Sequence, residues 1–348
     1  MNQRYEKSRQ YVGIDLHRRR SVVVRLDGEG EVVEAVQLEN SVPALVDAVG
    51  RAGPGAPVAV EATYGWYWAV DALRAAGFEV TLAHPRGVAS MQGRRAKTDK
   101  LDAKQLADLL RLDRLATAWI APPEVRELRE LVRYRHKLVG QRSAIKASIH
   151  AVLGKCGVIP PIADVFGPVG AKLLDALVLP EPYASRVASQ RRIMGLLSAE
   201  IAAVEVECVR RLKDNAQYRA LLTIGGVGPI TAAIFVAEIG DVHRFATADQ
   251  LACWTGLTTR VDSSDRRTRY GHVSKQGSRL LRWAAVESCQ HAREPYLAGK
   301  RRDLIARRGT RAQHIATVAT ARHMIKVVYY TMRDGHARCL DAPVPATP

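Results

Sequence analysis

The chain has 348 residues, 47% of them hydrophobic, and its 52 lysines and arginines against 35 aspartates and glutamates give a formal net charge of +17. This hydrophobic content excludes wholesale disorder, and no apolar stretch approaches the roughly 20 residues that span a bilayer. A positive excess of this size favours a nucleic-acid partner over a merely basic surface, because neutralising phosphates takes dense cationic side chains.

The cysteines and the amino terminus indicate the compartment. No two of the five cysteines form a CxxC pair and their spacing fits no zinc module, so we expect reduced thiols. The first eight residues lack the apolar centre of a signal peptide. We therefore expect a cytoplasmic, nucleoid-associated protein with no membrane partner.

Residues 11–84 alternate strand-like and helix-like patterns. The pattern predicts strands over 11–17, 20–26 and 31–38, a helix that Ser41 caps, a strand over 56–62, a helix over 66–76 and a strand over 78–83. A meander of three strands followed by strands that alternate with helices predicts an α/β sheet of the RNase H type.

The rest of the chain is predicted to be mostly helical. After a helix over 97–115, two long amphipathic stretches flank a turn region from about 154 to 182, and they predict either an antiparallel coiled-coil arm or an ordinary helical bundle. Further on, Leu221–Thr231 resembles a helix-hairpin-helix, whose backbone N–H groups bind phosphate. We expect a catalytic domain over 1–118, the helical arm over 119–214, a mostly α-helical carboxyl-terminal domain over 215–340 and a disordered tail over 341–348.

Four acids stand out in the amino-terminal part. Asp15 lies in a buried strand and Glu61 ends another, and both positions are costly for a carboxylate unless it is paired or binds metal. Asp99 and Asp102 lie three residues apart on one helix face. The first and fourth strands of an RNase H-like sheet are neighbours, so we expect the four acids to converge and to hold Mg²⁺, which prefers oxygen ligands. Alone, each acid would more often be a cap or a surface charge.

Motifs across the chain resemble one family. Gly13-Ile-Asp-Leu-His17, Val60-Glu-Ala-Thr63 and Lys97-Thr-Asp-Lys-Leu-Asp-Ala103 resemble the DEDD signature of the insertion-sequence transposases that include the Piv invertase and the bridge-RNA-guided recombinases. The carboxyl-terminal half adds matches over Leu222–Gly228, Glu238–Phe245, Leu251–Leu257 and Gly271–Arg279. The resemblance implies a RuvC-like amino-terminal domain, a coiled-coil linker and a carboxyl-terminal transposase domain. It also implies two Mg²⁺ ions, with Mn²⁺ able to substitute, on Asp15, Glu61, Asp99 and Asp102.

The resemblance further implies a serine nucleophile that forms a covalent phosphoserine. The family's serine precedes Gly between two of these motifs, which points to Ser264 with Ser263 as the alternative; Asp265 stands where Gly is usual. The other interpretation of Ser264 is a turn residue in a polar loop. Ser274 is a third candidate but is expected to cap the following helix.

Several cations are expected to contact nucleic acid. Arginines beside the serine could neutralise charge on the transferring phosphoryl group. A basic face of the first long helix is either solvated or lies along nucleic acid. The predicted nucleic-acid-binding residues are Arg266, Arg267, Arg269, Lys275, Arg279, Arg282, Arg133, Arg142 and Lys146.

The leading hypothesis is a transposase or site-specific recombinase that works as a homodimer or homotetramer on DNA, the element ends and the target. Some members of the family choose DNA with a structured guide RNA, and the lack of an obvious base-reading module here agrees with that. Two alternatives stay open. One is a RuvC-like junction nuclease that cuts by water attack, and the other is a non-catalytic DNA-binding regulator.

Overall fold

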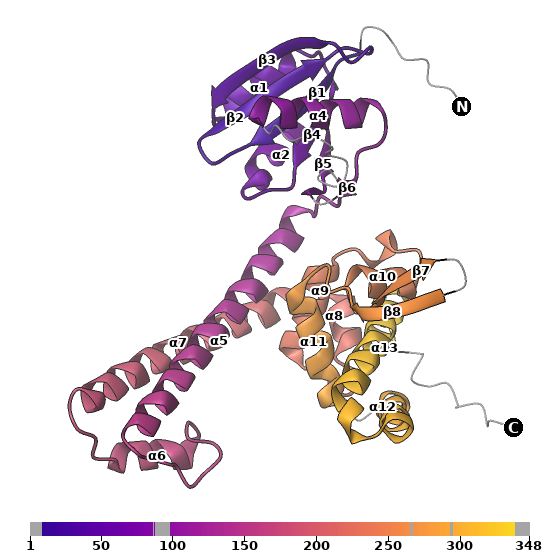
Figure 1. Cartoon of the computed structure of the whole chain (residues 1–348). Helices are drawn as coiled ribbons and strands as arrows, with labels where there is room; N and C mark the ends of the chain where they lie inside the picture. Colours follow the sequence, from indigo (N-terminus) through magenta and orange to yellow (C-terminus); the bar gives the residue numbers. More distant parts are fainter. Residues whose placement is uncertain (1–8, 86, 88–97, 265–266, 293–294, 338–348) are drawn as a thin grey trace, which may run out of the picture. The chain divides into compact units, whose positions relative to one another are not determined.

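The computed structural model describes residues 9–85, 87, 98–264, 267–292 and 295–337. The chain divides into two compact units, Met1–Ala121 and Pro122–Pro348. Figure 1 shows the helices and strands of each unit. Among the described residues, no helix has the length and apolar character needed to cross a membrane. The predicted disordered tail over 341–348 lies outside the described residues.

A six-stranded sheet forms the centre of the first unit, with the strand order β3-β2-β1-β4-β5-β6. Its strands are β1 (Tyr11–Leu16), β2 (Arg20–Leu26), β3 (Val32–Glu39), β4 (Pro57–Glu61), β5 (Glu79–Ala83) and β6 (Thr117–Ala118). The first three pair antiparallel, as the meander predicted, and β1 pairs parallel with β4. The predicted neighbourhood of the first and fourth strands is therefore confirmed. The two-residue strand β6, antiparallel to β5, was not predicted.

Helices cover both faces of this sheet: α1 (Val42–Gly50), α2 (Trp66–Ala75) and α4 (Asp99–Arg111). Because side chains alternate along a strand, Val12 and Ile14 of β1 pack into the core that includes the α1 and α2 residues. The opposite face packs against α4, where Ala103 and Ala107 meet the alternate residues of β2. Ser41 caps α1, as predicted, by accepting a hydrogen bond from the Ala44 N–H. This mixed α/β unit is consistent with an RNase H-like fold.

Gly13 lets α4 lie directly on β1. A Cβ atom at Gly13 would be 2.0 Å from the carbonyl oxygen of Ala103 and 2.6 Å from the backbone nitrogen of Ala107. Both neighbours are backbone atoms of α4, so only a glycine permits this approach. The contact sets the position of α4, and with it the position of the acids at the start of that helix.

Replacing Gly13 by alanine should therefore displace α4 and destabilise the first unit by about 3 kcal/mol, an overpacking cost. Urea unfolding monitored by circular dichroism measures this loss. Gly50→Ala is the matched control, because a Cβ atom at Gly50 meets nothing within 4 Å. Equal effects of the two substitutions would contradict the close packing of α4 on β1.

In the residues that the structure describes, the second unit is helical apart from one β-hairpin. Its elements are α5 (Pro123–Lys155), α6 (Pro168–Ala176), α7 (Tyr183–Leu212), α8 (Ala216–Leu221), α9 (Pro229–Ile239), η1 (Val242–Arg244), α10 (Ala248–Trp254), β7 (Thr259–Ser264), β8 (Arg267–Val273), α11 (Arg279–Gln290), α12 (Pro295–Arg308), η2 (Thr310–Ala312) and α13 (Gln313–Asp334). The helix α9, buried from Ala232 to Ile239, lies at the centre of the core of this unit.

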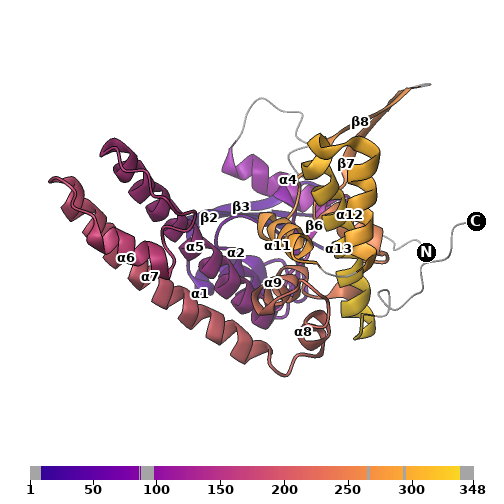
Figure 2. The ribbon, with the colours of Figure 1, turned by 90° about the horizontal axis from the view of Figure 1, so that it is seen from below.

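The long helices α5 and α7 lie side by side, and Figures 1 and 2 show the pair extending from the helical body of this unit. At the end nearest that body, Val132 of α5 and Val204 of α7 belong to the main core. At the far end, α6 closes a separate small core that includes Ile149, Leu174 and Val187. The pair of α5 and α7 is thus part of a helical bundle at the end nearest the body and a helical hairpin at the far end. Each of the two predicted arrangements, an arm and a bundle, describes one end of the pair.

Candidate active site

Two of the predicted acids lie on adjacent strands of the sheet. Asp15 is on β1 and is 6% exposed, and half-buried Glu61 ends β4. The parallel register pairs Ile14 with Val60, so the next residues along the two strands are Asp15 and Glu61. Alternation along the strands places both on the face that α4 covers. The sheet therefore presents two carboxylates at one end of neighbouring strands.

The helix α4 brings two further acids to this face. Thr98 starts the helix by accepting a hydrogen bond from the Leu101 N–H at 3.3 Å, which places Asp99 and Asp102 in its first turn. There the positive end of the helix dipole favours carboxylates. The charges of Asp99 and Asp102 both act on Asp15.

His17 joins this cluster, although the sequence prediction had not singled it out. Its Nε2 lies 3.2 Å from Oδ2 of Asp15 and 3.4 Å from Oδ1 of Asp99. One donor atom from each of Asp15, His17 and Asp99 lies within 4.8 Å of the others, a grouping that can hold a metal ion. The signal was present in the sequence, because His17 follows Asp15 by two residues at the end of a strand and such residues share one face.

Electrostatics favour a cation in this cluster. Burial raises the pKa of the Asp15 carboxyl above its ordinary value, the nearby His17 lowers it, and the charges of Asp99 and Asp102 raise it. The ionised form of Asp15 is therefore disfavoured unless a positive charge compensates it. The donors are mostly carboxylate oxygens, which suit hard divalent ions. The residues present fit a divalent metal site.

The two candidate serines lie on the β7–β8 hairpin, a region that had been predicted only as a stretch between motifs. Residues opposite each other share a face, so Ser264 lies with Arg267, and Asp262 lies with Arg269 on that same side. Ser263 is on the other side, where its hydroxyl lies 3.2 Å from that of Thr268.

The hairpin is exposed on both faces. Every residue of β7 and β8 is exposed apart from half-buried Val273. Both serine hydroxyls are thus accessible to a large substrate. Arg266, predicted to bind nucleic acid, and Asp265 lie outside the described residues.

The residues after the hairpin differ partly from expectation. Ser278, rather than Ser274, caps α11, and it accepts a hydrogen bond from the Leu281 N–H at 3.1 Å. The cap prediction for Ser274 is therefore wrong, because the helix begins four residues later. Arg282 donates to the carbonyl oxygens of Thr255, Gln276 and Gly277 at 2.8 to 3.1 Å, which ties the loop to the helix. Lys275 and Arg279 are exposed.

The predicted cations of α5 have partners within the fold. Arg133 forms two hydrogen bonds, at 2.8 and 3.0 Å, with the carboxylate of Glu238, which is 2% exposed. Arg142 donates to the Ser198 hydroxyl at 3.2 Å. Lys146 lies 5.1 Å from the centre of the Phe166 ring. Their predicted role in binding nucleic acid stays a prediction, and Arg133 has a structural role besides.

Arg133→Ala should destabilise the second unit by about 1–3 kcal/mol, because it leaves the Glu238 carboxylate buried without its bidentate partner. The double variant Arg133→Met with Glu238→Gln should recover part of that loss, since it removes both charges. Thermal unfolding of the two variants measures the difference. An unchanged unfolding temperature for Arg133→Ala would show that the pair contributes nothing to stability.

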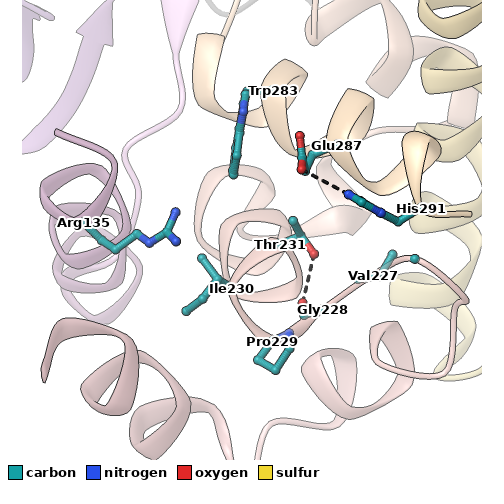
Figure 3. Close-up of a pocket in the computed structure, with 10 residues that line it drawn as sticks. Arg135, Val227, Gly228, Pro229, Ile230, Thr231, Trp283, Glu287 and His291 are labelled. Carbon is teal, nitrogen blue, oxygen red and sulfur yellow. Dashed lines mark hydrogen bonds and ion pairs between the residues drawn. The ribbon is translucent and has the colours of Figure 1, made fainter. Parts of the chain in front are cut away.

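The predicted helix-hairpin-helix segment folds as two helices, α8 and α9, around a Gly-rich turn. An open pocket of about 510 Å³ adjoins this turn, and Figure 3 shows Trp283 and Arg135 on its walls. Glu287 and His291, 3.4 Å apart, close another side. Pro229 starts α9, and no side chain caps that helix. Its first backbone N–H groups therefore lack a side-chain cap.

Two family models match the chain. One, described as "Transposase" and of the DEDD type of IS110, matches residues 12–157. The other, described as "Transposase IS116/IS110/IS902 family", matches residues 218–298. The chain belongs to the IS110/IS116/IS902 family of transposases. It is therefore an enzyme that acts on DNA.

Curated relatives agree with this family. A probable family 20 transposase of Pseudomonas aeruginosa is 28% identical over 80% of this chain and 82% of its own length. The transposase for insertion sequence element IS1328 of Yersinia enterocolitica is 24% identical over 81% and 85% of the two chains. The insertion element IS116 uncharacterized 44.8 kDa protein of Streptomyces clavuligerus is 26% identical over 93% and 94%.

The two matched stretches of this IS110/IS116/IS902 transposase contain the acidic cluster and the candidate serines, respectively. The first stretch spans Asp15, His17, Glu61, Asp99 and Asp102, and the second spans the β7–β8 hairpin with Ser263 and Ser264.

Proposed function

We propose that this transposase is a site-specific recombinase of an insertion sequence, which cuts DNA in a metal-dependent step and rejoins it through a serine. The observation that carries the proposal is the meeting of Asp15, His17 and Asp99 on the α4 face of the sheet. Such a cluster in a family of DNA-acting enzymes suits chemistry at phosphorus. We assign the first unit to the RuvC-like branch of the RNase H fold.

The residues that would hold metal are Asp15, Glu61, Asp99 and Asp102, with His17 beside Asp15 and Asp99. Mg²⁺ is the proposed ion and two ions the proposed number, because carboxylates supply nearly all the donors. When bound, such ions stabilise charge on the attacking and leaving oxygens of a phosphodiester. The protein's part is to hold the carboxylates together, with α4 fixed against Gly13.

Ser264 is the proposed nucleophile. Its hydroxyl oxygen would attack phosphorus, while the bond from phosphorus to a deoxyribose oxygen breaks and that strand end leaves as a hydroxyl. Attack on the phosphoserine by a hydroxyl of another strand would then restore a phosphodiester and free the serine. Arg267 and Arg269 share the face of Ser264, which favours Ser264 over Ser263, because guanidinium groups can stabilise negative charge on the phosphoryl group.

Partners of the enzyme follow from this chemistry. Strand exchange requires that two DNA duplexes be held together, so we propose that the enzyme works as a homodimer or homotetramer. A structured guide RNA from the element is proposed to choose the element ends and the target by base pairing, as the resemblance implies.

The proposed function is tested with two plasmids, one with the element junction and one with a target, incubated with the protein, Mg²⁺ and transcript of the flanking noncoding region. Wild type should yield joined products, and Asp99→Asn and Asp102→Asn should yield none. Omission of the transcript should also abolish them. Linear products without joining would favour the alternative, a RuvC-like nuclease that uses water. Products that form equally with EDTA would contradict the metal site.

A further inference from the structure

Several cations of the second unit form ion pairs with acids of the fold. On the long helices, Arg135 pairs with Glu205 at 2.6 Å and Arg211 pairs with Glu127 at 2.8 Å. Arg133 pairs with Glu238, as described above. On α13, Arg322 and Lys326 both pair with Asp249. These side chains contribute little to the excess positive charge that a partner meets.

The helix α12 and the turn after it hold a dense run of cations. Residues 300–311 hold six lysines and arginines against one acid, Asp303. The exposed cations of this segment, here named the α12 surface, are Lys300, Arg302, Arg307, Arg308 and Arg311. In the part of the chain that the structure describes, none of the five forms an ion pair. A share of the net charge of +17 therefore lies here without compensation.

The packing of α12 leaves these side chains free to meet a partner. The helix packs on α13 (Figure 1), and it also contacts the short η2. Leu297 is its buried anchor. Arg301 is half-buried, whereas the five side chains of the α12 surface are exposed. The fold thus holds α12 by its inner side while its cations face outward.

Clustered cations of this kind suit a regular polyanion. The cations of the helix lie between Lys300 and Arg308, a stretch of about 12 Å at 1.5 Å per residue. Along that length duplex DNA presents about seven phosphates, since it carries one charge per about 1.7 Å. Four of the five cations are arginines, whose planar guanidinium groups bind phosphate oxygens in pairs. The surface therefore matches the DNA backbone in charge and in length.

Duplex DNA fits this surface better than a single strand. Single-stranded nucleic acids are held by aromatic side chains on which bases stack. Tyr296 is the exposed aromatic residue of α12, and the Lys300 ammonium already lies 5.8 Å from its ring centre. Asp303 and the small Ala306 supply no stacking surface either. Contact with the phosphate backbone is the interaction that these residues support.

We propose that the α12 surface is a contact site for the backbone of duplex DNA, outside the acidic cluster and outside the β7–β8 hairpin. The proposal rests on the chain being an enzyme that acts on DNA. Because phosphate contacts carry no sequence information, the α12 surface would position the duplex while selection of sites lies elsewhere.

The test measures equilibrium binding of the full-length protein to a fluorescent duplex of about 30 base pairs in the presence of EDTA. The titration is repeated at KCl concentrations from about 50 to about 300 mM, because phosphate contacts weaken as salt rises. The variant carries Arg302→Gln, Arg307→Gln and Arg308→Gln. Its control carries Lys155→Gln, Lys172→Gln and Arg192→Gln, which are exposed cations on α5, α6 and α7. Both proteins lose the same net charge, at different places in the second unit.

The α12 variant should bind about 10- to 100-fold more weakly at about 150 mM salt, and its salt slope should fall by about 3. The control should stay within about 3-fold of wild type, and so should a variant with lysine at the same three α12 positions. Circular dichroism checks that each protein is folded. Equal weakening by the variant and the control would overturn the proposal.

A structured RNA of similar size serves as a second probe. Loss of RNA binding with duplex binding intact would also overturn the proposal and assign the α12 surface to RNA. Because EDTA removes the metal, the assay is independent of cleavage. Failure here would leave the proposed chemistry of the acids and the serine untouched.

Discussion

Ser264→Ala should abolish joined products and reduce strand cleavage by at least about 10³-fold, because the variant has no hydroxyl to attack phosphorus. Ser264 is exposed on the hairpin, so the protein should fold and unfold as wild type does. The measurement is the rate of product formation in the two-plasmid reaction, with thermal unfolding as the check on folding.

Ser263→Ala is the matched control for this variant. Ser263 is the next residue of the same strand, but its hydroxyl faces Thr268 on the other side of the hairpin. It should retain activity within about 5-fold of wild type, a surface-substitution effect. If Ser263→Ala were inactive and Ser264→Ala active, the nucleophile would be Ser263. If both were active, no serine of this hairpin would take part.

Asp15→Asn should have two opposite effects. Cleavage should fall by at least about 10³-fold, since metal ions supply several kcal/mol of stabilisation to such a transition state. The metal-free first unit should nevertheless unfold at a higher temperature than wild type, on the order of 5 °C. The reason is that Asn removes a buried charge that lies close to those of Asp99 and Asp102. Differential scanning calorimetry in EDTA measures the second effect.

The pH dependence of that gain follows from the raised pKa of Asp15. The folded state binds a proton at Asp15 more tightly than the unfolded state, in which the pKa of this carboxyl is near its ordinary value of 3.8. Below that pH the Asp15 carboxyl is protonated in both states, so it does not change the free energy of unfolding. As pH rises from there through the folded pKa of Asp15, the wild type loses stability relative to Asp15→Asn. The advantage of the variant should therefore grow with pH and then stay constant.

Mg²⁺ should reverse the order of the two proteins. Wild type should gain about 2.7 kcal/mol of stability at 100 times the dissociation constant, and Asp15→Asn should gain little. A higher stability of wild type in EDTA would contradict the interpretation that Asp15 is an uncompensated buried charge. Ala62→Ser, a neutral change beside Glu61, serves as the control. It should alter neither the unfolding temperature in EDTA nor the stability gained with Mg²⁺.

The sheet of the first unit was predictable because its strands carry strong local signals. The strand over 20–26 has the predicted bounds, and Ser41 caps α1 as predicted. The adjacency of Asp15 and Glu61 followed from the expected fold, in which the first and fourth strands are neighbours. The two-residue β6 was missed because so short a strand has no periodicity.

Features that depend on distant residues left no signal in the sequence. The hairpin of β7 and β8 is exposed on both faces, so the apolar alternation that predicts a strand is absent. Glu238 lies 105 positions from Arg133, and no local pattern links them. The place of His17 in the cluster could have been predicted, because a histidine two residues after a buried aspartate on a strand points to the same side of the sheet. The run of cations over 300–311 is visible in the sequence, whereas the exposure of five of them is known only from the structure.

The most direct test of the central claim is to map the covalent intermediate. Wild-type protein is incubated with supercoiled plasmid that carries the element junction, Mg²⁺ and the transcript, then denatured, digested with nuclease and protease, and analysed by mass spectrometry. We expect a nucleotide phosphate on the peptide that contains Ser264, absent when EDTA replaces Mg²⁺. Cleaved plasmid with no modified peptide would contradict the serine mechanism and leave a metal-dependent nuclease that uses water.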